Sequence, residues 1–160
     1  MQLRPPAQLV SPRARTLWAV QGVMLTVVLV VAGIATLVLA DPPRWWVILG
    51  IVVVAAVFVT DAIVMPLLRY RIHRWEVTDD AVYTQRGFLT VEQRIAPISR
   101  VQTVDTERGA LSRLFGLSTV TVTTASAKGE LRIEGLDRRD AERIVRDLTV
   151  VTAASPGDAT

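Results

Sequence analysis

Two long uncharged stretches dominate the first half of the chain. The first, 17–40, holds 24 consecutive residues without a charge, and the second, 45–68, is interrupted only by Asp61. At about 1.5 Å of rise per residue, either stretch as a helix exceeds the roughly 30 Å hydrocarbon core of a bilayer. The pattern predicts two transmembrane helices, and the two prolines of the link at 41–44 end the first of them.

Positive charges flank this pair of spans at its two outer ends. Three arginines precede the first span and three follow the second, whereas the link between the spans carries one arginine beside one aspartate. Short flanks rich in arginine stay on the cytoplasmic side. We therefore expect an inner (plasma) membrane protein with both termini cytoplasmic, including the segment 1–16, and with the link 41–44 outside. The competing interpretation is a signal peptide cleaved near Ala40, but the core of a signal peptide spans only about 7–15 residues.

Beyond residue 69 the pattern changes to short segments rich in valine, threonine and isoleucine, separated by turn residues. This spacing is typical of an all-β unit. A short helical segment is expected within 106–116, and an apolar stripe at helical spacing predicts a closing helix at 137–148. The expected strands are 71–78, 81–86, 88–95, 98–105, 117–125 and 130–135. We thus predict a folded domain at 69–151 and a disordered tail at 152–160.

The composition removes most catalytic and metal-binding chemistry. Apolar residues make up 51% of the chain, and it has no cysteine and one histidine. A disulfide framework, a thiolate metal site, a cysteine nucleophile and a histidine cluster are therefore excluded. We expect no catalytic residue, no metal and no cofactor. A membrane-associated enzyme remains a third alternative, because His73 could only be combined with a serine that lacks the context of a nucleophile elbow.

The basic character of the chain does not indicate nucleic-acid binding. The sequence pI is near 10.2, yet residues 69–150 contain 14 basic and 12 acidic side chains with no interleaving of basic and aromatic residues. We expect no nucleic-acid partner.

Several segments resemble the bacterial pleckstrin-homology-like membrane proteins of the YdbS-like group. The resemblance rests on the passage out of the second span, a glycine before Phe88, two strands with the link between them, and the last helix. These are residues 70–78, Gly87, 98–104, 113–122 and 141–148. The resemblance implies a membrane-tethered cytoplasmic domain, a pleckstrin-homology (PH) like sandwich or partly open barrel capped by a C-terminal helix. It implies no established biochemical role, because this fold carries many functions.

One departure from the lipid-binding PH domains concerns their phosphate site. Eukaryotic members hold inositol phosphates with basic residues around the first hairpin, but here that turn carries Asp79 and Asp80. Two carboxylates repel a phosphate group. We therefore expect no phosphoinositide selectivity.

Charged and polar residues near the inner ends of the spans are the first candidate site. Asp61 is an ionisable group inside a span, which usually marks a function or a paired structural role. Its position near the inner boundary also allows a hydrogen bond to Gln21 or snorkelling toward Arg69 or Arg71. We interpret the arginines Arg69, Arg71 and Arg74 as membrane-surface anchors, since three cations fall short of the 4–8 typical of specific lipid recognition.

The second candidate is an apolar cluster in the link at 110–117. Leu111, Leu114 and Phe115 follow the spacing i, i+3, i+4. They either plug the sandwich as core residues or form an exposed edge that binds a partner. With no catalytic inventory, we predict a membrane-tethered interaction module that belongs to a membrane protein complex or a homo-oligomer. A peripheral sensor of anionic lipid or of the envelope is the alternative.

Overall fold

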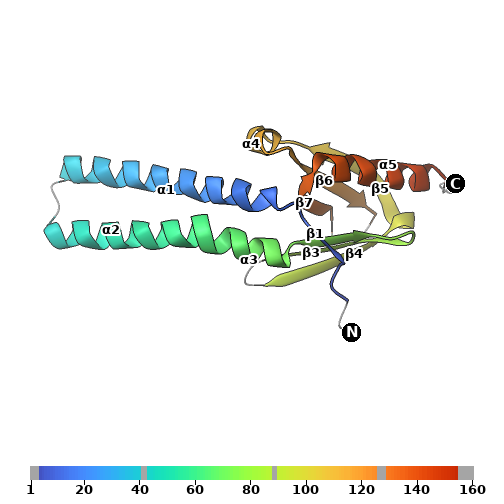
Figure 1. Cartoon of the computed structure of the whole chain (residues 1–160), viewed down its shortest axis with the longest axis horizontal. Coiled ribbons are helices and arrows are strands. Elements are labelled where there is room, and N and C mark those ends of the chain that lie inside the picture. Colours follow the sequence, from blue (N-terminus) through green and yellow to red (C-terminus); the bar gives the residue numbers. More distant parts are fainter. Residues whose placement is uncertain (1–3, 41–42, 88–89, 126–128, 155–160) are drawn as a thin grey trace.

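The computed structural model describes residues 4–40, 43–87, 90–125 and 129–154. A long helical hairpin projects from one end of a small β domain (Figure 1). Its first arm is α1 (Arg13–Ala40), and its second is the continuous series α2 (Arg44–Val59), η1 (Thr60–Val64) and α3 (Met65–Ile72). The stretches Arg13–Leu39 and Arg44–Ile72 are each long and apolar enough to cross a membrane.

The second arm contains one turn of π-helix, η1, directly before Pro66. Proline has no N–H and its ring clashes with the carbonyl group four residues earlier in an α-helix. The wider π-helical turn makes room for the proline ring. In this turn the N–H of Met65 donates to the carbonyl oxygen of Thr60, five residues back. The helix then continues to Ile72, where the N–H of His73 donates to the carbonyl oxygen of Arg69 at 2.8 Å.

This continuation corrects the expected boundary between span and domain. We predicted a strand at 71–78, but residues up to 72 are helical and the strand β2 occupies only Arg74–Val77. The side chains from Leu67 to Arg71 favour a helix, and the ladder of i to i−4 hydrogen bonds has no reason to stop at the last apolar residue. The second arm therefore enters the domain as a helix.

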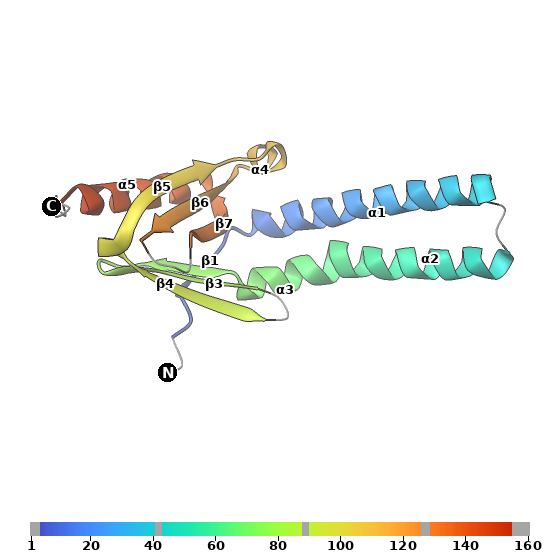
Figure 2. The same ribbon diagram turned by 180° about the vertical axis from the view of Figure 1, so that it is seen from behind.

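The domain is a sandwich of two antiparallel sheets, seen from two sides in Figures 1 and 2. One sheet has the order β1-β2-β3-β4, and the other has the order β5-β6-β7. The sandwich is not a closed barrel, and the prediction of a PH-like sandwich with a C-terminal helix is confirmed. The remaining elements are β1 (Gln8–Leu9), β3 (Ala81–Gly87), β4 (Val91–Pro97), η2 (Ile98–Arg100), β5 (Val101–Glu107), α4 (Ala110–Leu114), β6 (Leu117–Thr124), β7 (Leu131–Asp137) and α5 (Arg138–Ala154).

Most predicted strands are present, with shifts that have local causes. The strand expected at 88–95 lies at Val91–Pro97, and residues 88 and 89 are outside the described part. Pro97 ends that strand on a sheet edge, where its missing N–H costs no ladder hydrogen bond, and a 3₁₀ turn follows it. The strand expected at 98–105 therefore begins only at Val101. The helix α5 extends through Ala154, past the expected end of the domain at 151, and the rest of the expected tail, 155–160, is outside the described residues.

The chain ahead of the first span is part of the domain. Strand β1 pairs with β2, with Gln8 opposite Trp75, and the N–H of Ser11 donates to the carbonyl oxygen of Gly135 at 2.9 Å. The start of α1 is buried as well, because Ala14 is fully covered. Residues 8–18 therefore pack against the sandwich, although we expected the domain to begin at residue 69 and residues 1–16 to be an N-terminal segment. We call this contact of residues 8–18 with the sandwich the seam.

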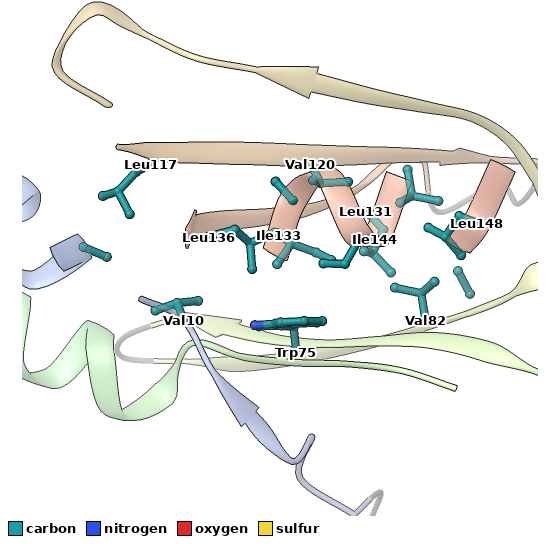
Figure 3. Packing of buried hydrophobic residues seen from close by; sticks show 14 of the residues in the cluster. Val10, Trp75, Val82, Leu117, Val120, Leu131, Ile133, Leu136, Ile144 and Leu148 are labelled. Carbon is teal, nitrogen blue, oxygen red and sulfur yellow. The ribbon is translucent and has the colours of Figure 1, made fainter. Parts of the chain in front are cut away.

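The core lies between the two sheets and α5, as Figure 3 shows. Trp75 and Val82 reach it from the first sheet, Val120 from the second and Leu148 from α5. The seam extends this cluster toward the hairpin. Its buried members are Val10, Ala14, Leu17 and Trp18.

Candidate functional site at the membrane boundary

An open groove of about 410 Å³ lies where the two arms of the hairpin meet the domain. One wall comes from the first turns of α1 and the other from η1 and α3. Its lining combines apolar side chains with three polar ones, and polar side chains are rare in helices that cross a membrane. The lining residues are Trp18, Gln21, Gly22, Leu25, Asp61, Met65 and Arg69.

The base of the groove is set by a close approach of two helix backbones. A Cβ atom on Gly22 would lie 2.4 Å from the carbonyl oxygen of Asp61, so only glycine fits there. Small residues allow this kind of helix contact in membranes. The hydroxyl of Thr26 donates to the carbonyl oxygen of Gly22 at 3.1 Å, and this threonine is buried.

The structure brings Gln21 and Asp61 to the same groove. The side chain of Gln21 is exposed and that of Asp61 is half-buried. Among the described residues, however, no hydrogen bond or ion pair is made by either side chain, so the hydrogen bond that we considered between them is not formed. Both side chains line the open groove.

Arg69 turns toward the domain rather than toward Asp61. Its guanidinium carbon lies 4.9 Å from the ring centroid of Trp18, a cation–π arrangement, and its Nη2 atom lies 4.0 Å from Oε2 of Glu134. The arginine therefore joins the last turn of α3 to α1 and to β7.

The three arginines expected as anchors do not form one cluster. Arg69 and Arg71 lie in the last turn of α3, where a positive charge interacts favourably with the helix dipole. Arg71 is exposed. Arg74 is half-buried in β2, opposite Gln85. A further arginine joins the boundary from α1, because the guanidinium of Arg15 lies 4.8 Å from the ring of Tyr70. Their role as surface anchors stays a prediction.

His73 is a buried structural residue at the junction of α3 and β2. Its Nδ1 atom lies 2.8 Å from the carbonyl oxygen of Arg69, and its ring lies 5.2 Å from that of Trp18. Burial holds the pKa of His73 below its usual value of 6.5. The ring is therefore neutral at neutral pH and donates its Nδ1–H to Arg69. No group of acidic or histidine side chains within the described ranges could hold a metal ion.

The apolar cluster of α4 is divided by the fold. Leu111 and Phe115 pack against the core, whereas Leu114 is 80% exposed. A helix of five residues can turn only one face to the core. Leu111 and Phe115, which are four residues apart, lie on that face. The three side chains are not one continuous surface.

The first hairpin turn is formed as predicted. The N–H of Ala81 donates to the hydroxyl of Thr78 at 3.2 Å, and Asp79 and Asp80 are exposed. A hollow of about 240 Å³ between this turn and α5 contains Asp79 and Asp147 beside a single arginine, Arg143. Two carboxylates against one guanidinium make a poor phosphate site.

Sequence reasoning missed Gly22 and the seam. Part of the seam has a signal in the sequence, because Ala14, Leu17 and Trp18 follow the spacing i, i+3, i+4 of one helix face, whereas Val10 precedes the helix. The long apolar run that begins at Leu17 concealed this stripe. Gly22 has no such signal, since nothing in the sequence pairs it with the backbone of Asp61.

Comparison with known proteins agrees with this architecture. Residues 18–149 match the family described as Bacterial PH domain. The chain belongs to this family. It is also 31% identical over 143 residues to the transmembrane protein YdbS of Bacillus subtilis (strain 168), an alignment that covers 87% of this chain and 88% of the relative. No solved structure gives a significant match.

Membership in the Bacterial PH domain family confirms the resemblance drawn from the sequence. The hairpin with two helices that could span a membrane agrees with the transmembrane relative. Neither description states an enzymatic activity.

Proposed function

We propose that this protein is a membrane-anchored interaction module, in which both termini are cytoplasmic and a further membrane helix binds along the groove. The observation that carries the proposal is the pair of polar side chains, Gln21 and Asp61, which line the groove without a partner among the described residues. An ionisable group within a span is costly unless it is paired. A donor on a neighbouring helix would satisfy the carboxylate of Asp61.

The seam supports the same proposal. Because Ala14 and Trp18 belong to the domain core and α3 runs directly into β2, both arms of the hairpin are joined to the sandwich without a flexible linker. The domain therefore keeps one orientation relative to the hairpin. A partner bound along the groove would meet a fixed face of the domain, which suits a component of a membrane complex or a homo-oligomer.

The orientation is tested with a reporter that is active only outside the cytoplasm. Fused after Thr160, such a reporter should be silent, because Arg13 and Arg15 at the start of the first arm and Arg69 and Arg71 at the end of the second should retain both flanks inside. The same reporter inserted in the link 41–44 should be active and serves as the positive control. Activity at Thr160 would reverse the orientation.

The binding of a further helix is tested by photo-crosslinking in intact membranes. A photoreactive amino acid at Leu25, which lines the groove, should give adducts of higher mass. The same residue at Ile48, an exposed position on α2 outside the groove, is the matched control and should give fewer. Mass spectrometry of the adduct then separates a second copy of this chain from another protein.

Replacement of Asp61 by leucine should weaken this crosslink. Interhelical hydrogen bonds in membranes contribute about 0.6–2 kcal/mol, which corresponds to about a 3- to 30-fold loss of occupancy at a limiting partner concentration. Asp61→Asn retains a hydrogen-bonding group and should lose less. Adducts to lipid alone at position 25, or protein adducts that Asp61→Leu leaves unchanged, would contradict the proposal.

A further inference from the structure

The short helix α4 lies on the side of the domain from which the hairpin projects. In both views it sits beside the first turns of α1, at the opposite end of the domain from the end of α5 (Figures 1 and 2). The contacts agree, because a Cβ atom on Gly116, just after α4, would lie 3.5 Å from Nη1 of Arg13. Leu114, at the tip of α4, is 80% exposed.

The hairpin fixes where the bilayer surface must lie relative to α4. Leu17 and Trp18 are covered by the domain, and the first exposed large apolar side chain of α1 is Val23. Before this point, the guanidinium groups of Arg15 and Arg69 lie over the aromatic rings of Tyr70 and Trp18. Aromatic rings with cations beside them are typical of the headgroup region. The first turns of α1 therefore lie at the membrane surface, and α4 lies next to them.

We propose that α4 rests in this membrane surface, with Leu114 inserted at the boundary of the acyl chains and Arg113 contacting anionic headgroups. Arg113 is exposed, and its Nε atom donates to the carbonyl oxygen of Arg108 at 3.3 Å, which holds the side chain across the base of α4. Asp137, an acidic group on this side, is already paired with Arg13 at 3.2 Å. A tip that combines one leucine and one arginine matches the chemistry of a headgroup layer.

The division of the apolar cluster supports a lipid surface as the occupant. Leu111 and Phe115 are used by the core, so only Leu114 remains for an outside contact. A single apolar side chain buries little area in a protein interface and needs a complementary pocket there. A bilayer can accept the same side chain without a pocket. The proposal is independent of the groove and needs no protein partner.

The test uses the full-length protein, which contains no cysteine. A single cysteine replaces Leu114, is labelled with an environment-sensitive fluorophore, and the purified protein is reconstituted into vesicles of phosphatidylethanolamine and phosphatidylglycerol. We expect blue-shifted emission and strong quenching by lipids that carry a nitroxide near the top of the acyl chain. The matched control is Val150→Cys, which is 68% exposed on α5 far from the hairpin and should be quenched severalfold less.

Two outcomes of this experiment would contradict the proposal, and a change of lipid composition tests the role of Arg113. Emission from position 114 that is aqueous and no more quenched than at position 150 would overturn it. Blue-shifted emission without lipid quenching, rising with the ratio of protein to lipid, would also overturn it in favour of a protein contact. Replacing phosphatidylglycerol by phosphatidylcholine should reduce the quenching at 114, and this reduction should disappear in the Arg113→Ser background.

Discussion

Replacement of Gly22 by alanine should separate the two arms of the hairpin and destabilise the protein. The new Cβ would lie 2.4 Å from the carbonyl oxygen of Asp61 and 2.9 Å from the backbone nitrogen of Ala62. Because these are backbone atoms, neither can rotate away, and α1 must move. Overpacking of this kind costs about 1–3 kcal/mol, and Gly22→Leu should cost more. The measurement is a thermal melt of the full-length protein in detergent, followed by tryptophan emission.

Gly33→Ala is the matched control on the same helix. A Cβ atom at Gly33 has no neighbour within 4 Å. Alanine there should leave the melting temperature unchanged or raise it slightly, since glycine within a helix is less favourable than alanine by about 0.5–1 kcal/mol. If Gly22→Ala and Gly33→Ala behave alike, the helices do not meet at Gly22.

Substitution of Gly135 by valine should open the seam. Gly135 has φ +73°, a left-handed conformation that other residues adopt at a cost of about 1–2 kcal/mol and that β-branched residues tolerate least. A Cβ atom there would also lie 2.9 Å from Cβ of Ala14. The start of α1 would have to leave the sandwich, which exposes Val10 and Trp18. We therefore expect a lower melting temperature and faster tryptic cleavage after Arg13 and Arg15.

Gly129 separates backbone strain from the close contact. Its φ is +76°, nearly the same as that of Gly135, but a Cβ atom at Gly129 meets nothing within 4 Å. Gly129→Val should therefore lower the melting temperature without accelerating cleavage at the seam. Combining Gly135→Ala with Ala14→Gly removes the clashing methyl group and should restore protection relative to Gly135→Ala alone. Equal cleavage in the variants of the two glycines would show that the seam does not depend on Gly135.

Much of the fold could be predicted from the hydrophobic pattern, because uncharged runs, strand alternation and helical stripes are all local features of the sequence. The uncharged runs indicate the two arms, the alternation at Thr119–Thr123 indicates β6, and the apolar stripe from Ala141 to Leu148 indicates α5. The errors lie where a local pattern has two meanings. Residues 71–78 contain enough valine and aromatic residues to suggest a strand, but the helix that precedes them continues to Ile72.

The candidate site was less accessible to sequence reasoning, because it depends on contacts between distant segments. The residue types that suggested Asp61, Gln21 and Arg69 were informative, and the structure brings these three to one groove. The partners of Arg69 were not predictable, since the ring beneath its guanidinium belongs to Trp18 and its acidic neighbour is Glu134. For Leu111, Leu114 and Phe115, spacing alone could not decide which side chain faces outward.

The pairing of β1 with β2 brings together two segments that the helical hairpin separates in the chain. These strands are neighbours in one sheet, so the whole helical hairpin is the connection between them. A flexible loop of that length would add to the entropy lost when the strands pair. With both arms inserted as proposed, Leu9 and Arg74, which pair in the sheet, would emerge side by side, and the bilayer would have closed the loop. Because β7 is the last strand to be synthesised and only α5 follows it, the sandwich would be completed on a strand pair that membrane insertion had already brought together.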